Sequence, residues 1–229
     1  MIKSLKEIQQ EIIELSPLSK QVKLLAVSKK QSPDKIYSLY QQGQRLFGEN
    51  YLQEALSKMT ELKSLTASNE PIEWHFIGHL QSNKINQTVG NFSVIHSIDS
   101  LKKVELVNTS ALKKNLVQRI LLEINVGEED SKNGFLISEL LTSWKQITNF
   151  KNIKIEGLMC LPPQSEDPKI QASFFVKMRL LLEQLNKLKE PSFPLLTDLS
   201  MGTSGDYQIA LKEGATIIRL GTILFGERG

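Results

Sequence analysis

From residue 23 to its C-terminal end, the chain alternates short apolar runs with segments of helical periodicity, and few folds accommodate such a pattern. Runs that are apolar almost throughout are typical of strands buried on both faces, as in parallel sheets whose strands are joined by crossover helices. We identify eight runs: KLLAVSK (23–29), RLFGE (45–49), EWHFIG (73–78), VIHSID (94–99), RILLEIN (119–125), IKIEGLMC (153–160), DLSM (198–201) and IIRLG (217–221).

The number of units and the chain length favour one architecture. Closed barrels of eight parallel strand-helix units take about 250 residues, and this chain has 229 residues. We therefore predict an α/β fold, a single (β/α)₈ barrel of the TIM type with an additional N-terminal helix. A doubly wound open sheet is the structural alternative, because it is built from the same units.

Helix boundaries are marked at several places between the runs. Ser32 and Pro33 predict a helix start, since serine caps a first turn and proline fits the first helical position. Gly43 marks the end of that helix, and Ser100 predicts the start of another. The longest predicted helix carries an apolar stripe at helical spacing: Phe174, Met178, Leu181, Leu182, Leu185 and Leu188.

The N-terminal segment predicts an amphipathic helix over residues 1–16 that packs on the barrel. Charged residues interrupt its apolar positions, so it resembles neither a signal peptide nor a membrane span. No change in composition and no long linker divides the sequence, and we expect one domain over residues 1–229. The apolar positions of the helix are Ile2, Leu5, Ile8, Ile12 and Leu15.

Charge and cysteine content exclude several classes of protein. The net charge is only +3, which provides no extended cationic face for nucleic acid. The single cysteine, Cys160, has no partner for an internal disulfide, as is usual in a reducing compartment. We expect a cytoplasmic protein that binds neither nucleic acid nor membrane, and a monomer, because no strong exposed apolar stripe calls for an obligate partner.

Two adjacent lysines, Lys29 and Lys30, stand at the end of the first predicted strand. In a parallel barrel, ligands bind at the carboxyl ends of the strands. A desolvated lysine tends to lose its proton, and a neutral amine can form a Schiff base with a carbonyl group. Strand alternation directs one of the two lysines to the barrel interior and the other outward, without deciding which. Both can also be ordinary solvated lysines.

Two glycine-bearing turns follow the last two predicted strands, SMGTSGD (200–206) and RLGT (219–222). Backbone N–H groups in such turns bind phosphate, and barrels frequently place a phosphate site after the seventh and eighth strands. A lysine amine and a phosphate site together predict a ligand with a carbonyl at one end and a phosphate at the other. Pyridoxal 5′-phosphate (PLP) fits this description, and so does the phosphorylated sugar of a Schiff-base aldolase.

For the histidines and the cysteine, we favour structural roles over metal-binding or nucleophilic ones. The spacing of His75 and His79 suits a metal only on a helix, whereas this segment predicts strand and turn. We expect His96 to be a hydrogen-bonded strand residue and Cys160 to be a small core residue. The sequence therefore predicts no metal site and no catalytic residue.

Several blocks closely resemble the pyridoxal-phosphate homeostasis protein family, which is itself similar to the N-terminal barrel domain of alanine racemase. The resemblance extends from about residue 23 to residue 228, and WHFIGHLQSNK is its most specific block. The blocks are AVSK (26–29), FGENYLQEA (47–55), WHFIGHLQSNK (74–84), GLM (157–159), LSMGTSGD (199–206) and RLGTILFGER (219–228).

The resemblance implies a role for individual residues. Lys29, in AVSK, would hold PLP as an internal aldimine, and Asn50 would lie beside the cofactor. Arg219 would face the pyridine nitrogen. The phosphate would be bound by Ser204, Gly221 and Thr222. One departure is Thr203, where the family usually has methionine, and it affects only the packing of the phosphate loop.

The same resemblance bears on activity. A guanidinium only donates hydrogen bonds, so Arg219 pairs with an unprotonated ring nitrogen, which makes the ring a poor electron sink. Racemisation needs a base on each face of the α-carbon. The resemblance implies that alanine racemase takes its second base, a tyrosine, from an additional β-domain. Only residues 222–229 follow the last predicted strand, and we expect that domain to be absent.

The expected function is therefore to carry or buffer PLP in intracellular vitamin B6 homeostasis, without robust catalytic turnover. Transient contact with PLP-dependent apoenzymes would deliver the cofactor. The alternatives are a racemase-like PLP enzyme of low activity and a Schiff-base aldolase acting on a phosphorylated sugar.

Overall fold

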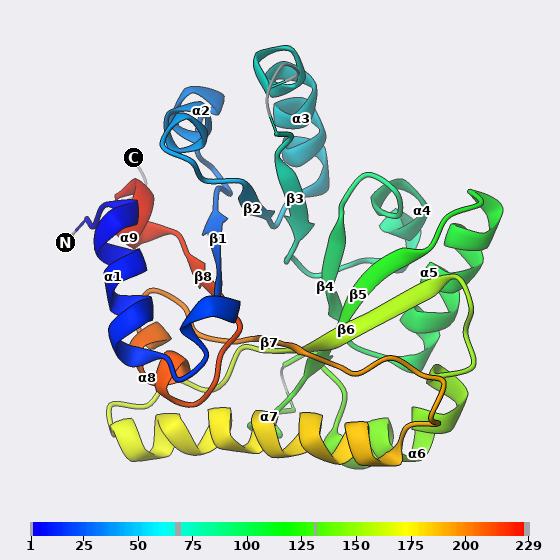
Figure 1. Cartoon of the computed structure of the whole chain (residues 1–229). Helices are drawn as coiled ribbons and strands as arrows, with labels where there is room; N and C mark the ends of the chain where they lie inside the picture. Colours follow the sequence, from blue (N-terminus) through cyan, green and yellow to red (C-terminus); the bar gives the residue numbers. More distant parts are fainter. Residues whose placement is uncertain (1, 67–69, 131, 227–229) are drawn as a thin grey trace.

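A computed structural model describes residues 2–66, 70–130 and 132–226. Eight parallel strands close into a barrel in sequence order, and the last strand pairs with the first (Figure 1). The predicted (β/α)₈ barrel is thus confirmed, and each of the eight apolar runs contributes one strand. The strands are β1 (Lys23–Val27), β2 (Leu46–Glu49), β3 (Glu73–Phe76), β4 (Val94–Ile98), β5 (Gln118–Ile124), β6 (Ile153–Cys160), β7 (Asp198–Ser200) and β8 (Ile217–Leu220).

Helices surround the barrel and alternate with the strands along the chain (Figure 1). They shield the outer face of the sheet, as the apolar character of the strands requires. The α-helices are α1 (Leu5–Leu15), α2 (Pro33–Gln41), α3 (Leu52–Thr66), α4 (Ile85–Thr88), α5 (Leu101–Lys113), α6 (Ile137–Ile147), α7 (Pro168–Leu188), α8 (Tyr207–Lys212) and α9 (Thr222–Phe225), with short 3₁₀ helices at Ser19–Gln21 and Ser82–Lys84.

The predicted helix boundaries agree with the structure. The Ser32 hydroxyl accepts a hydrogen bond from Lys35 N–H at the start of α2, and Ser100 caps α5 in the same way. Gly43 follows α2 with φ of 100°, a left-handed conformation that suits glycine. On α7 the buried stripe contains Phe175 rather than Phe174, and Met178, Leu181 and Leu185 match the prediction. Leu182 is only half-buried and Leu188 is exposed, so the predicted stripe was wrong at Leu188.

The apolar core has two layers. A small cluster fills the barrel interior, and a larger one lies between the strands and the helices. Alternation along each strand sends neighbouring side chains into different layers. The interior cluster consists of Leu25, Val94, Leu121, Met159 and Ile217.

Helix α1 lies beside α8 and α9 (Figure 1). It begins with a capping box between Ser4 and Glu7 and contacts α8 through Glu11, which accepts a hydrogen bond from the Tyr207 hydroxyl. Lys3 N–H donates to the carbonyl of Ile223 in α9, at 2.8 Å. These contacts hold the N-terminal segment against the last two helices of the barrel. None of the helices in the described part of the chain has the length and apolar content needed to cross a membrane.

Candidate functional site

One pocket at the carboxyl ends of the strands brings together all six residues singled out by the sequence: Lys29, Asn50, Ser204, Arg219, Gly221 and Thr222. Its volume is about 300 Å³, which lies at the lower end of the range for small-molecule sites. A second pocket of about 450 Å³ lies next to it and shares Gln164, Thr203 and Gly205. The larger pocket contains neither Lys29 nor Arg219, so the smaller one is the candidate site.

The turn after β1 distinguishes the two lysines. The strand ends at Val27, two residues earlier than predicted, because Lys30 adopts a left-handed φ of 60° that no strand accommodates. Strand alternation therefore does not decide their directions. Lys29 is half-buried and lines the pocket, whereas Lys30 is exposed, with Nζ 6.0 Å from the ring centre of Tyr51.

An ion cluster, formed by the buried Glu49 and Lys58 and the half-buried Glu54, holds this turn on both sides of Lys29. The Lys58 ammonium donates to the Ser28 carbonyl at 2.8 Å and to Glu49 Oε1 at 2.9 Å, and it also pairs with Glu54. Glu54 in turn accepts a hydrogen bond from the backbone N–H of Lys30. The cluster therefore fixes the backbone immediately before and after the candidate amine.

Sequence reasoning missed this cluster, although a signal was present. Lys58 lies on the buried face of α3, three residues after Ala55 and four before Leu62. A lysine is rarely buried unless it is paired, so its position on an apolar stripe predicts a buried partner. Burial raises the pKa of Glu49, which is completely inaccessible to solvent.

Asn50 follows the end of β2 and is fixed by close backbone packing. A Cβ atom on Gly78 would lie 2.0 Å from the Asn50 carbonyl oxygen, so only glycine allows the two segments to approach this closely. The side-chain oxygen Oδ1 of Asn50 is buried and has no hydrogen-bond partner among the described residues. Such a group is costly unless something donates to it, and its place in the pocket lining makes a ligand a suitable donor.

The two glycine-bearing turns meet at the same side of the pocket. Gly202 has φ of 91°, and its carbonyl accepts a 3.0 Å hydrogen bond from Arg219 N–H, which ties the turn after β7 to β8. The Asp206 carboxylate accepts from both the backbone N–H and the hydroxyl of Thr203. Gly221 precedes the first turn of α9 and lies close to Val27 of β1. Residues of both turns therefore line the same pocket as Lys29.

Arg219 forms part of the pocket wall and is only 4% exposed. Its Nη1 donates to the Ser200 hydroxyl at 2.7 Å, and its Nη2 donates to the Cys160 carbonyl at 2.8 Å. Burial lowers the pKa of the guanidinium, but an arginine in a protein keeps its proton and acts only as a donor.

The remaining sequence candidates lie outside the pocket. Among the described residues, no group of histidine, cysteine, aspartate and glutamate side chains has the arrangement of a metal site. His75 is buried on β3 and hydrogen-bonded to His96, while His79 is exposed, with Nδ1 3.9 Å from Asp99. Cys160 is fully buried, and burial raises the pKa of its thiol to about 12, which does not suit a nucleophile.

Comparisons with known proteins agree with this architecture. The family model for the alanine racemase N-terminal domain matches residues 4–229. A pyridoxal phosphate homeostasis protein of Aquifex aeolicus is 40% identical over 206 residues, covering 90% of this chain and 87% of that protein. The protein of the same name from Synechocystis is 41% identical over 218 residues, covering 95% and 96%.

Solved structures give the same grouping. PipY of Synechococcus elongatus, solved with PLP bound, has a TM-score of 0.84 and 34% identity, covering 96% of this chain and 100% of that chain. An alanine racemase of Clostridium difficile, with a TM-score of 0.73, 14% identity and coverage of 95% and 58%, shares the fold alone. With these identities across nearly its whole length, the chain belongs to the pyridoxal phosphate homeostasis protein family, whose barrel matches the alanine racemase N-terminal domain.

Proposed function

We propose that this protein binds PLP in the pocket at the carboxyl ends of the strands and acts in vitamin B6 homeostasis as a carrier or buffer. The observation that carries the proposal is the single pocket that contains both the Lys29 amine and the two glycine-bearing turns. The buried, unpartnered oxygen of Asn50 is a second feature that a polar ligand would satisfy. The names of the relatives and the PLP-bound PipY structure support the same ligand.

Each residue has a distinct part in this proposal. Lys29 would hold the aldehyde carbon of PLP through its side-chain nitrogen, with the aldehyde oxygen released as water, and Asn50 would lie beside the cofactor. Ser204, Gly221 and Thr222 bind the phosphate with hydroxyl and backbone N–H donors. Bound PLP supplies an electrophilic aldehyde and an electron-accepting ring.

Arg219 faces the ring nitrogen in this proposal and determines how reactive the site is. Because a guanidinium only donates, it leaves that nitrogen without a proton of its own, which weakens the ring as an electron sink. A weak electron sink stabilises carbanions poorly and suits storage better than turnover. We therefore propose that the protein is not a robust enzyme, and a racemase-like activity of low rate is the second candidate.

An amino-acid assay separates the two candidates. When the PLP-loaded protein is incubated with a panel of amino acids, we expect racemised, decarboxylated or transaminated products to form far more slowly than one turnover per second, the low end of typical enzymes. Chiral chromatography of the products measures this rate. Turnover at or above about one per second would identify an enzyme.

The wider role is proposed on the same basis. Residues 1–229 would form one PLP-binding domain, with the helix within residues 1–16 packed on the barrel. The protein would be a cytoplasmic monomer that releases PLP during transient contact with PLP-dependent apoenzymes. Masking the aldehyde between such contacts would protect other amines in the cell.

Borohydride trapping tests the covalent link directly. Reduction of the PLP-loaded protein is expected to attach the cofactor permanently to Lys29, because that amine lines the pocket and Lys30 is exposed outside it. Peptide mass spectrometry locates the adduct, and the Lys30→Ala variant serves as the matched control that keeps it. An adduct on Lys30, or none at all, contradicts the assignment. A protein without any pyridine chromophore would instead fit a Schiff-base aldolase.

A further inference from the structure

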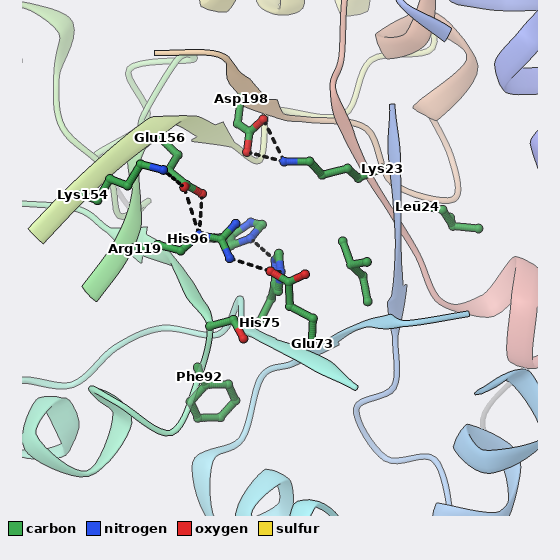
Figure 2. Close-up of polar contacts among 12 residues, drawn as sticks. Lys23, Leu24, Glu73, His75, Phe92, His96, Arg119, Lys154, Glu156 and Asp198 are labelled. Carbon is green, nitrogen blue, oxygen red and sulfur yellow. Dashed lines mark hydrogen bonds and ion pairs between the residues drawn. The ribbon is translucent and has the colours of Figure 1, made fainter. Parts of the chain in front are cut away.

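A chain of polar side chains, buried from Arg219 to His75 and ending at the half-buried Glu73, crosses the barrel interior beneath the pocket. Arg219 Nη1 donates to Ser200 Oγ at 2.7 Å, and Ser200 Oγ lies 3.0 Å from His96 Nδ1. His96 Nε2 lies 2.8 Å from His75 Nδ1, and His75 Nε2 lies 3.3 Å from Glu73 Oε1, the longest and least well aligned contact of the series. Figure 2 shows the part of this series that joins His96, His75 and Glu73.

This series of polar side chains belongs to the interior layer of the barrel, not to the layer beneath the helices. His96 stands two residues after Val94 on β4, and Arg219 stands two residues after Ile217 on β8. Val94 and Ile217 are both members of the interior cluster, so strand alternation directs the two polar side chains inward as well. Both His96 and Ser200 are completely inaccessible to solvent.

The charged groups at the two ends give the chain a direction. The Arg219 guanidinium can only donate, and a carboxylate can only accept. Glu73 is ionised, because the His75 imidazole and the Arg119 guanidinium lower its pKa to about 2. Arg119 Nη1 donates to Glu73 at 2.7 Å, which secures the acceptor end (Figure 2).

Only one order of protons suits both the donor at one end of the chain and the carboxylate at the other. The Ser200 hydroxyl accepts from Arg219 and donates to His96 Nδ1. His96 then carries its proton on Nε2 and donates to His75 Nδ1, so that the proton of His75 is on Nε2 and faces Glu73. The reversed order would point a lone pair of His75 at the carboxylate and leave the buried Ser200 hydroxyl without an acceptor.

We propose that Ser200, His96 and His75 are positioning residues that hold the Arg219 guanidinium in the pocket wall, with both imidazoles neutral and in the Nε2–H tautomer. No ion pair of Arg219 occurs in the described parts of the chain, so these hydrogen bonds and the Cys160 carbonyl are what orient it. Burial also lowers the pKa of both imidazoles, which favours their neutral forms.

The tautomers are measurable in the protein before any ligand is added. Long-range ¹H–¹⁵N correlation spectra distinguish Nε2–H, Nδ1–H and doubly protonated imidazoles. The protein has three histidines, and the His79→Gln variant removes the exposed one from the spectrum. We expect the Nε2–H pattern for both His75 and His96. An Nδ1–H or doubly protonated His96 would overturn the proposal.

A binding experiment tests the positioning role, and this part rests on the proposed function. The dissociation constant of PLP is compared with that of its 1-deaza analogue, in which carbon replaces the ring nitrogen. We expect the wild-type protein to favour PLP on the order of ten-fold, the effect of one hydrogen bond to a charged group, and Ser200→Ala to lose most of that preference. A general loss of packing would weaken both ligands equally.

One variant serves as the control. Ser97→Ala removes another buried strand hydroxyl that lies outside this series of polar contacts, and it is expected to keep the preference for PLP. An unchanged preference in Ser200→Ala would refute the positioning role. If the wild-type protein binds neither ligand, the proposed function is refuted. The proton order along Ser200, His96 and His75 is then tested by the measured histidine tautomers alone.

Discussion

Lys58→Met is expected to lower the free energy of unfolding by about 3–5 kcal/mol, the range for removing one partner of a buried ion pair. Glu49, its partner, is completely buried, and Lys58 itself is only 5% exposed. Without the ammonium, Glu49 Oε1 retains only the Ser28 hydroxyl as a donor, and Oε2 has no partner among the described residues. The variant therefore leaves a carboxylate in an apolar layer with little to stabilise its charge.

Denaturant unfolding without ligand measures this loss. Lys63→Met on the same helix, at an exposed position, is the matched control and should change stability by no more than about 0.5 kcal/mol. The double variant Glu49→Gln/Lys58→Met is expected to regain part of the loss, since it removes the uncompensated charge. If Lys58→Met unfolded at the same denaturant concentration as the control, the buried pair would not have the importance assigned to it.

The pH dependence of the Lys58→Met variant follows from the same carboxyl group. Burial already raises the pKa of Glu49, and without the ammonium that pKa should rise further. When a carboxyl group binds its proton more tightly in the folded state than in the unfolded state, the folded protein loses stability as pH rises through the folded-state pKa of that group. The deficit of the variant is therefore expected to grow from mildly acidic to mildly alkaline buffer.

The fold was predictable because its signals are local. Both faces of each strand are buried, so the eight runs are apolar almost throughout, and caps such as Ser32 and Ser100 act within one helical turn. The first strand was predicted two residues too long, because the left-handed turn at Lys30 depends on tertiary hydrogen bonds. No local pattern records such bonds.

The site was predictable only in part, for a related reason. The resemblance pointed to Lys29 and to the two glycine-bearing turns, and the structure places them around one pocket. The side chains that contact Arg219 directly or in series come from distant strands. We predicted structural roles for His75 and His96, and both are hydrogen-bonded in the structure. Their connection to Arg219 through Ser200 exists only once the barrel closes. Their partners are defined by sheet topology rather than by spacing along the sequence.

Lys29→Ala is expected to abolish most of the stabilisation that PLP confers. A ligand at about 100 times its dissociation constant stabilises a folded protein by about 2.7 kcal/mol, which for a chain of this length raises the melting temperature by roughly 5–10 °C. Lys29 lies in a turn beyond the end of β1 and is only half-buried, so its truncation should leave the barrel folded. Without the amine, we expect the two glycine-bearing turns proposed to bind the phosphate to retain PLP only weakly.

Thermal melts of the variant with and without PLP check this expectation, and circular dichroism of the unliganded protein verifies its fold. Lys30→Ala is the appropriate control, because it removes a neighbouring charge of the same kind that is exposed outside the pocket. We expect it to keep the full shift. If Lys29→Ala gained as much stability from PLP as the wild type, contacts to the phosphate rather than the covalent link would dominate binding. The role assigned to the Lys29 amine would then be wrong.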